Sequence, residues 1–178
     1  EHQICGKMQE YPIIILPECE VLSDEFRTSL LNYVQNGGSL LAIGARTAAL
    51  FRDFLGTRFE GEPSEADMFV SSGDMLGWLG GLWQNVIPVS AKCAGMRFPT
   101  TDTRKNGKCA VTITQFEKGL IAAIYGPIGD VYYRSHVPAL RNFLGNVMSQ
   151  LFQPIVEVYG PPSIDLSLRR NDSKMMIH

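Results

Sequence analysis

Apolar runs and helical stripes alternate along the first third of the chain. Residues 12–16 (PIIIL) form a continuous apolar run, which is typical of a strand covered on both faces. Ser23 then precedes apolar positions at helical spacing, and the segment Asn36-Gly37-Gly38 ends that stretch. A second apolar run covers residues 39–43. Because crossover connections are right-handed, the pattern predicts a βαβ unit with parallel strands that are neighbours or near-neighbours.

The later part of the chain predicts more strands and one long helix. Thr47 is expected to cap a short helix that Gly56 stops. Residues 110–116 and 120–125 are expected to form an antiparallel pair that closes the sheet. A helix that begins near Ser135 carries the clearest apolar stripe of the chain.

Two regions depart from this regular pattern. Residues 57–108 are interrupted by glycine, proline and acidic residues, and only a short strand at 86–89 and a turn at Asn106-Gly107 are predicted there. The long helix ends at Pro154. After it the pattern predicts short strands at 155–159, 164–168 and 174–177, with a turn at 171–173. The change of character divides the chain into an α/β domain, residues 1–154, and the start of a C-terminal β-domain, residues 155–178.

An apolar cluster inside the irregular region contains both tryptophans of the chain. Trp78 and Trp83 lie five residues apart among leucines and glycines. Large aromatic side chains at this spacing are more often part of a core or an interface than of a ligand site. We therefore predict a core or interface role for Trp78 and Trp83, with stacking on a sugar ring as the alternative.

Composition and charge indicate an ordinary soluble globular protein. The chain is 45% hydrophobic, and 16 Lys and Arg residues against 18 Asp and Glu residues give a net charge of −2. The basic residues are scattered, which argues against nucleic acid or a membrane surface as partner. No apolar run approaches the roughly 18–20 residues that span a bilayer. No signal peptide is recognisable, and the compartment stays open between cytoplasm and periplasm or secretion.

The cysteines show no metal-binding or redox spacing. Cys5, Cys19, Cys93 and Cys109 contain no C-x-x-C motif, and a chain of this size does not need disulfides for stability. Free, mostly buried thiols are therefore predicted.

Three segments together resemble a known family. They are YPIIILPE…LSDEF…LLNYVQNGGSLLAIG, QFEKGLIAAIYGPIGDVYY and VEVYGPPSIDLSLRRNDSKMMIH. They resemble the glutamine-amidotransferase-like middle domain of multidomain glycoside hydrolases, of which the β-galactosidase trimerisation domain and fucosidase-like proteins are examples. The resemblance implies a flavodoxin-like, doubly wound, mostly parallel sheet. It also implies that a first strand and helix would precede Tyr11, so that the sheet has an exposed edge that invites pairing.

The resemblance further implies a non-catalytic role. The family chemistry needs a cysteine nucleophile, a histidine base and an oxyanion-binding loop. The corresponding turns here are Ile43-Gly44-Ala45, Tyr125-Gly126-Pro127 and Pro17-Glu18-Cys19, so glycine replaces the nucleophile and the histidine is missing. The expected role is packing against the catalytic barrel domain of the parent chain or against the same domain in another subunit. No cofactor is expected.

Other residues offer weaker chemistry. Cys19 lies at the carboxyl end of a strand, where doubly wound folds bind ligands, so a cysteine-dependent hydrolase or amidotransferase is the alternative function. Glu18 and Arg46 are candidate ligand-binding residues for the same reason, and a small-ligand sensor is a third possibility. Arg46 is more simply explained by a surface salt bridge.

The remaining titratable residues form no recognisable site. Glycosidase chemistry needs two carboxylates roughly 5–10 Å apart, and the sequence pairs none of the candidates. His136 is expected to have a surface or capping role, and the scattered histidines predict no metal site. The carboxylates considered are Glu18, Glu20, Asp53 and Asp130.

Overall fold

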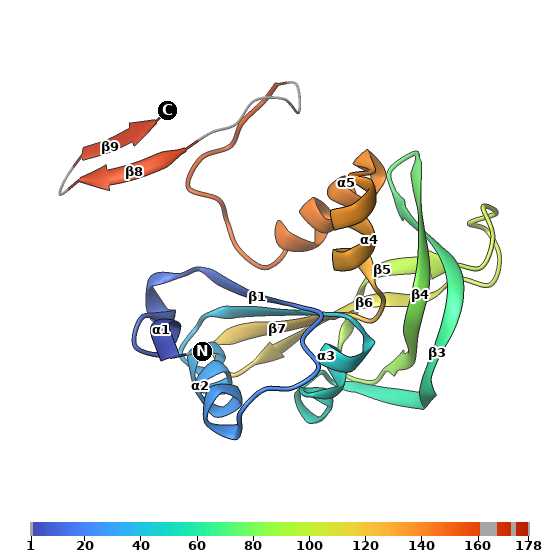
Figure 1. Ribbon diagram of the computed structural model, residues 1–178, viewed down its shortest axis with the longest axis horizontal. Helices are drawn as coiled ribbons and strands as arrows, with labels where there is room; N and C mark the ends of the chain where they lie inside the picture. Colours follow the sequence, from blue (N-terminus) through green and yellow to red (C-terminus); the bar gives the residue numbers. More distant parts are fainter. Residues whose placement is uncertain (1, 161–166, 172–173, 178) are drawn as a thin grey trace.

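The computed structural model describes residues 2–160, 167–171 and 174–177. Its centre is a seven-stranded sheet with the order β1-β2-β7-β6-β5-β3-β4 (Figure 1). Helices pack on this sheet, so the α/β class predicted from the sequence is confirmed. In the described residues, no helix is both long and apolar enough to cross a membrane.

The predicted βαβ unit forms the parallel part of the sheet. Strands β1 (Ile13–Pro17) and β2 (Ser39–Ile43) are parallel neighbours, and β7 (Gly119–Ile124) pairs parallel to β2 on its other side. Helix α2 (Asp24–Gln35) connects β1 to β2. The Ser23 hydroxyl accepts the Phe26 N–H at 3.2 Å and caps this helix, and Gly37 closes it at φ +107°.

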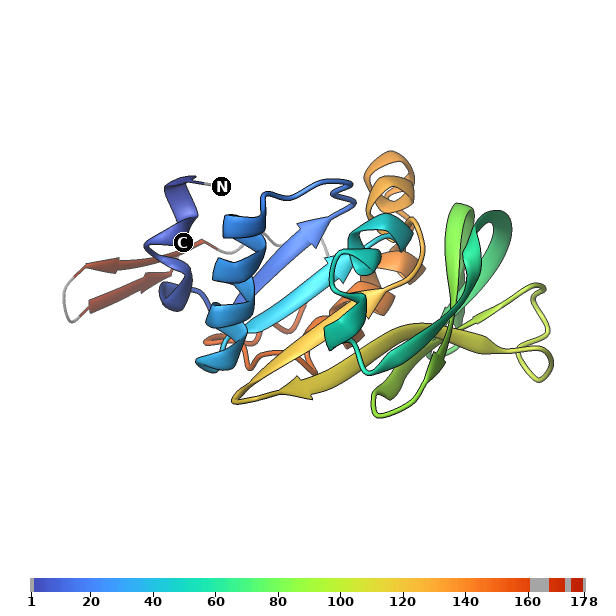
Figure 2. The ribbon, with the colours of Figure 1, turned by 90° about the horizontal axis from the view of Figure 1, so that it is seen from below.

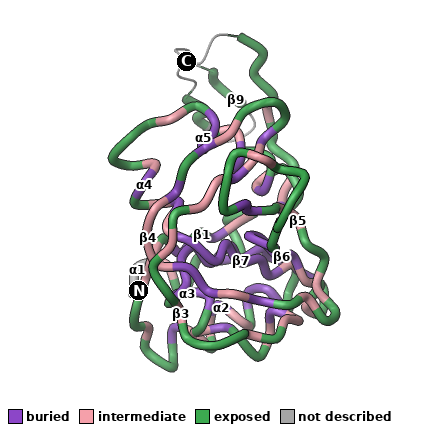
Figure 3. The backbone as a smooth tube through the Cα atoms, turned by 90° about the vertical axis from the view of Figure 1, so that its right-hand side faces the viewer, coloured by how far each residue is buried: buried purple, intermediate pink, exposed green. Residues whose placement is uncertain are grey.

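The parallel part of the sheet is covered on both faces, as its continuous apolar strands require. Leu40 and Ala42 of β2 pack with the residues of α2 and of α3 (Ala45–Ala49). Leu41 and Ile43 pack with α4 (Ile128–Ser135) and α5 (Pro138–Met148) on the opposite face. Figure 2 shows α2 and α3 on one side of these strands, and Figure 3 shows that the strands of this part are the most buried. Two apolar clusters therefore sandwich the parallel strands.

The antiparallel part of the sheet is much larger than predicted. The expected pair is present as β6 (Lys108–Phe116) and β7. The region 57–108, expected to hold one short strand, contains β3 (Thr57–Ser72), β4 (Met75–Pro88) and β5 (Lys92–Phe98). The single-strand prediction was wrong because the glycines and proline of this region interrupt the alternation without ending the strands.

A bulge in β3 is one such interruption. The pairing of β3 with β4 shifts between Glu60 and Ser64, where Gly61 has φ +62°. The buried Gln84 side chain donates to the carbonyl groups of Glu60 and Gly61 at 3.3 and 3.2 Å. The Gln84 N–H also donates to the Tyr125 carbonyl at 3.0 Å. The curved β3–β4 ribbon is thereby attached to the end of β7 and arches over the carboxyl ends of the parallel strands.

Two helix predictions need correction. Helix α3 begins at Ala45, with Gly44 as its N-cap residue, so Thr47 lies inside the helix. A separate 3₁₀ turn, η2 (Arg52–Phe54), follows it. The helix predicted from Ser135 is α5, which begins at Pro138, and the Gly-rich segment before it forms α4. His136 has φ +52° and ends α4, which separates the two helices.

The two ends of the chain form small elements. A short helix α1 (His2–Cys5) and a 3₁₀ turn η1 (Met8–Glu10) precede β1, and a hairpin of β8 (Leu168–Asn171) and β9 (Lys174–Ile177) follows the α/β unit. The strand predicted at 155–159 is irregular structure instead. Most of the strand predicted at 164–168 and of the turn at 171–173 lies outside the described residues. The domain boundary at residue 154 stays a prediction.

The prediction of free, mostly buried cysteines was wrong, because two of the four form a disulfide and, of the other two, Cys5 is exposed and Cys19 only partly buried. Cys93 of β5 and Cys109 of β6 form a disulfide with a Cα–Cα distance of 5.9 Å. These residues lie 16 positions apart in the sequence and meet only because β5 and β6 are antiparallel neighbours. Since β5 was not predicted, spacing alone could not bring them together.

Candidate functional site

Three turns meet at the carboxyl edge of the parallel strands. They follow β1, β2 and β7, and the β3–β4 ribbon covers them from one side. Between them lies a pocket of about 260 Å³. It occupies the position where open α/β sheets bind ligands. Its lining consists of Glu18, Glu20, Gly44, Ala45, Arg46, Thr47, Glu65, Leu82 and Pro127.

Gly44 lines this pocket at the turn after β2, where the sequence resemblance would place a cysteine nucleophile. It is buried and has φ +103°, a conformation that L-residues rarely adopt. A β-carbon placed at this position would lie 3.0 Å from Cγ of Glu18. A side chain at residue 44 would therefore be strained and would press against Glu18.

Glu18 lies directly above Gly44 and is itself in an unusual conformation. Its φ is +48°, and its N–H donates to the Ile43 carbonyl at 2.8 Å, which continues the β1–β2 ladder. Its carboxylate accepts the N–H of Asp130 at 2.9 Å, in the first turn of α4. Pro127, the N-cap residue of α4, provides no side-chain cap. Glu18 therefore serves as the acceptor that this helix N-terminus requires.

Arg46 does not present a free cation to the pocket. Its guanidinium forms an ion pair with Glu20, and both side chains are more than half exposed. The salt-bridge interpretation of Arg46 is therefore confirmed. The pocket brings together three of the candidate residues, Glu18, Glu20 and Arg46. Glu20 and Arg46, however, form an ion pair with each other.

Cys19 lies beside this pocket with its sulfur directed elsewhere. Its side chain is partly buried and packs against the apolar cluster of α2 and α3. The sulfur lies 3.6 Å from the Pro17 carbonyl oxygen, and the Cys19 carbonyl accepts the Thr47 hydroxyl at 2.8 Å. Glu18 and Glu20, its sequence neighbours, line the pocket instead.

The other candidate residues are not gathered at this site. Asp130 forms an ion pair with Arg134 one turn further along α4. Asp53 lies in η2, and His136 is exposed at the end of α4 with its ring centroid 5.9 Å from that of Tyr132. Over the described ranges, no three His, Cys, Asp or Glu side chains are grouped so that they could hold a metal ion.

The two tryptophans have different environments. Trp83 is 1% exposed, and Arg97 stacks on its ring at 4.4 Å from the centroid. Of the two roles predicted for it, core or interface, Trp83 has the core position, because the curved ribbon turns this side chain inward. Trp78 is 52% exposed on the same strand. An interface role for Trp78 stays a prediction.

Arg97 is a buried cation that the sequence did not single out. It is 1% exposed, and its Nη2 donates to Asn85 Oδ1 at 2.5 Å and to the Gln84 carbonyl at 3.4 Å. Within the described residues, its Nε and Nη1 have no hydrogen-bond partner. Burial lowers the pKa of Arg97 to about 10. Only the position of β5 reveals this environment, and β5 was not predicted.

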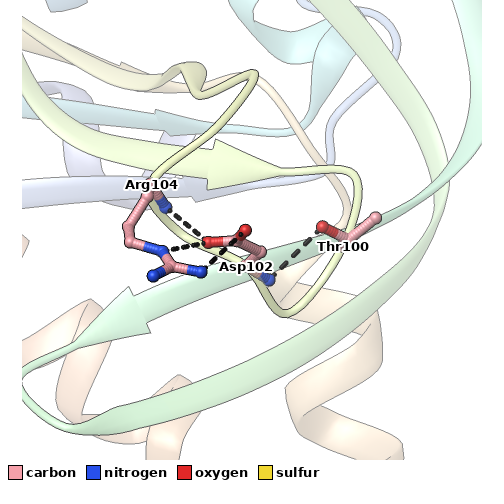
Figure 4. Close-up of polar contacts among 3 residues, drawn as sticks. All are labelled: Thr100, Asp102 and Arg104. Atoms are coloured by element: carbon pink, nitrogen blue, oxygen red, sulfur yellow. Dashed lines mark hydrogen bonds and ion pairs between the residues drawn. The ribbon is translucent and has the colours of Figure 1, made fainter.

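The turn between β5 and β6 is stabilised by local polar contacts. Figure 4 shows these contacts. The Asp102 carboxylate accepts hydrogen bonds from the backbone N–H of Arg104 at 3.2 Å and from the Arg104 side-chain Nε at 2.8 Å. The backbone N–H of Asp102 donates to Thr100 Oγ1 at 3.3 Å. The side-chain hydrogen bond with Arg104 lowers the pKa of Asp102 and raises that of Arg104. Asn106 has φ +55° in the predicted turn.

Sequence comparison finds no match to a protein-family model or to a curated protein. Solved structures with the same fold are nevertheless found. The β-galactosidase from Rahnella sp. R3 superposes with a TM-score of 0.68 at 16% identity, over 95% of this chain and 27% of that one. Gan42B, a GH42 β-galactosidase from G. stearothermophilus, gives a TM-score of 0.65 at 18% identity, over 96% and 26%.

The same fold occurs outside β-galactosidases. The α-L-fucosidase isoenzyme 2 from Paenibacillus thiaminolyticus superposes with a TM-score of 0.63 at 17% identity, over 82% of this chain and 26% of that one. The chain thus spans about a quarter of the length of these three enzymes. At these identities the likeness establishes a shared fold, namely that of a segment found within several glycoside hydrolases.

Proposed function

We propose that this chain is a non-catalytic, glutamine-amidotransferase-like accessory domain of a glycoside hydrolase. Its sheet would then be a variant of the flavodoxin-like class I amidotransferase sheet, with β3, β4 and β5 as an antiparallel extension. Its role would be packing against the catalytic barrel domain of the parent chain or forming a homo-oligomer. The shared fold with segments of β-galactosidases and a fucosidase supports this assignment.

The observation that carries the proposal is the position of Glu18 over Gly44. An amidotransferase needs an accessible thiolate at the turn after β2 and a histidine beside it. The residues that line this pocket include neither cysteine nor histidine. Glu18 fills the space above Gly44 and is held there by the N–H of Asp130. A pocket blocked in this way favours a structural role for the turn.

The free edge of the sheet bears on how the domain would assemble. Strand β1 lies at one edge, and Ile15 at its centre is 37% exposed. The Glu18 N–H points to β2. Because the backbone N–H and C=O groups of successive residues point to opposite sides of a strand, those of Ile15 and Pro17 point away from β2, toward the edge of the sheet. Pro17 has no N–H to offer to an added strand. Side-chain packing is therefore a better proposal for assembly than strand addition at this edge.

Two measurements on the purified chain test the proposal. Light scattering across a concentration series is expected to give a stable dimer or trimer if the role is oligomerisation. A monomer at every concentration would restrict the role to packing within the parent chain. Hydrolysis of glutamine or of an aryl glycoside at enzyme-like rates would contradict the proposal in either form.

The alternative function, a cysteine-dependent hydrolase that uses Cys19, requires a reactive thiol. Iodoacetamide labelling at neutral pH, followed by mass spectrometry, measures its rate of alkylation against a free cysteine in a peptide. Because the Cys19 side chain packs against the core cluster, we expect slower labelling than in the peptide. Labelling clearly faster than the peptide would favour the enzyme.

A further inference from the structure

A second cavity lies next to the pocket at Gly44. It also measures about 260 Å³ and is lined by Trp78, Gly80, Val131, Arg134 and Ser135. Both cavities are bordered by β4 and by α4 with the turn before it: Leu82 and Pro127 border the first, and residues 78, 80 and 131–135 border the second. The two cavities follow one another along the same pair of elements. We call this surface the β4–α4 groove.

The ring of Trp78 forms one end of the β4–α4 groove. Gly80 allows its position, because a β-carbon there would lie 2.5 Å from Cζ2 and 2.9 Å from Cη2 of the indole. The ring therefore lies over the backbone of its own strand and is still 52% exposed. An aromatic ring supported in this way presents a fixed apolar surface at little entropic penalty.

Groups that donate and groups that accept hydrogen bonds lie along the groove beside this ring. Asp67 pairs with Gly80 in the β3–β4 ladder, and its Oδ1 lies 2.7 Å from the position of a Gly80 β-carbon. Glu65 pairs with Leu82 in the same ladder and lines the first cavity. Both carboxylates are exposed and, within the described part of the chain, have no hydrogen-bond or ion-pair partner. Arg134 and Ser135 lie across the groove on α4. The Ser135 hydroxyl donates to the Val131 carbonyl at 2.7 Å and can still accept a hydrogen bond, and the Arg134 guanidinium has further N–H groups besides the one that pairs with Asp130.

We propose that the β4–α4 groove binds a short carbohydrate chain, with one pyranose ring stacked on Trp78. A sugar ring offers an apolar face to an indole, and its hydroxyls both donate and accept hydrogen bonds. Carboxylates on one wall, and on the other the Ser135 oxygen and the remaining N–H groups of Arg134, match that property. Two carboxylates without partners make the groove unsuitable for an anionic ligand. They also disfavour a protein contact, which would desolvate them.

This inference deepens the proposed function and rests on it for the class of ligand. In a glycoside hydrolase, such a groove would hold a neutral oligosaccharide away from the catalytic barrel. The residues that carry it are Trp78, Asp67 and Glu65, and none of them belongs to the turn at Gly44.

Tryptophan fluorescence provides a direct test. The chain contains two tryptophans, of which Trp83 is buried and Trp78 exposed, so a change in acrylamide quenching reports on Trp78. We expect one of three probes, β-1,4-galactotetraose, mannotetraose or cellotetraose, to protect Trp78 with a Kd of about 1 mM or below. Isothermal titration calorimetry gives the affinity without relying on fluorescence.

Four variants separate the groove from the general surface. Trp78→Ala is expected to weaken the calorimetric binding by about tenfold or more, and Asp67→Asn by several-fold. Gly80→Ala keeps the ring and displaces it, so it should weaken binding without removing the aromatic residue. Tyr133→Ala, which removes an aromatic side chain that is 79% exposed on the outer surface of α4, is the matched control and should bind like the parent.

Two results would overturn the inference. One is the absence of any change with all three probes at about 10 mM while circular dichroism shows a folded chain. The other is protection of Trp78 by increasing protein concentration alone, together with a self-association in light scattering that Trp78→Ala loses, which would assign the ring to a protein interface. In both cases the proposed accessory role would survive, because it is contradicted only by hydrolytic activity.

Discussion

The carboxylate of Glu18 accepts a hydrogen bond from the backbone N–H of Asp130 at 2.9 Å, across 112 positions of sequence. One side chain thus joins the turn after β1 to the first turn of α4. It also packs on Gly44, the N-cap residue of α3. Glu18 therefore connects all three turns that surround the pocket at the carboxyl edge of the sheet.

Removing this carboxylate should destabilise the domain. Glu18→Ala leaves the N-terminus of α4 without an acceptor, and we expect the free energy of unfolding to fall by about 1 kcal/mol, as for the loss of a helix cap. Glu18→Gln keeps an acceptor and should lose less. Urea denaturation measures the difference. Glu20→Ala is the control, because its ion pair with Arg46 is exposed and should contribute well under about 1 kcal/mol. Equal losses at both positions would contradict the capping role.

The fit between Gly44 and Glu18 gives a second prediction. Gly44→Ala should be destabilising for two reasons: the positive φ, which alone costs about 1–2 kcal/mol, and contact with the Glu18 side chain. Gly37→Ala is the matched control, since Gly37 has a similar φ of +107° and no atom within 4 Å of an added β-carbon. Denaturant unfolding should show a larger loss at residue 44.

A double-mutant cycle isolates the contact. In a Glu18→Ala background, Gly44→Ala should lose only about as much stability as Gly37→Ala does in the parent chain. An unchanged loss would show that Glu18 does not occupy the space above Gly44. Gly44→Cys, which places a cysteine where an amidotransferase would carry its nucleophile, is expected to remain inactive toward glutamine, because the strain and the Glu18 carboxylate are still present.

Local sequence signals predicted the parallel part of the fold well. The Ser23 cap, the Gly37 stop and the two apolar runs all act over short distances, and each has its predicted position. The β3–β4 ribbon was missed because its curvature depends on a bulge and on glycines that individually resemble turn signals. Bulges become visible only when the partner strand is known.

The candidate site likewise has a part that could be predicted from the sequence and a part that could not. The turns at Glu18 and Gly44 could be predicted because they end apolar strands whose carboxyl ends must share an edge. Glu65, Leu82 and Trp78 reach the pocket region only through the arch of the ribbon, which local periodicity does not encode. The burial of Arg97 and the Cys93–Cys109 disulfide could not be predicted for the same reason, since both depend on β5.

The disulfide gives a third prediction. Cross-linking residues 16 positions apart restricts the unfolded chain and should stabilise the domain by about 3 kcal/mol. Cys93→Ser should therefore lower the urea midpoint substantially, and reduction of the parent chain should have the same effect. Cys5→Ser, at an exposed residue outside the disulfide, should change little. Alkylation of the denatured, unreduced protein should label only two of the four cysteines, and labelling of all four would contradict the pairing.

The buried guanidinium of Arg97 gives the last prediction. Burial lowers its pKa from the ordinary arginine value to about 10, so the unfolded chain binds this proton more tightly than the folded one. Between the pKa of the folded state and the higher pKa of the unfolded state, the unfolded state carries more protons, and the stability of the parent chain relative to a variant without this group should rise with pH. At neutral pH the folded state instead carries the full penalty of a buried charge with two nitrogens that lack partners within the described residues.

Arg97→Met removes that penalty at similar volume. We expect the variant to equal or exceed the parent in free energy of unfolding at neutral pH, by up to about 1 kcal/mol, and to lose this advantage as the pH passes 10. Urea denaturation at a series of pH values measures the difference in free energy of unfolding at neutral pH and its change as the pH rises. Arg104→Met is the control, because its guanidinium is on the surface and its pKa is raised rather than lowered. A loss of about 3 kcal/mol at neutral pH in Arg97→Met would contradict the prediction, because the contacts with Trp83 and Asn85 would then outweigh the burial of charge.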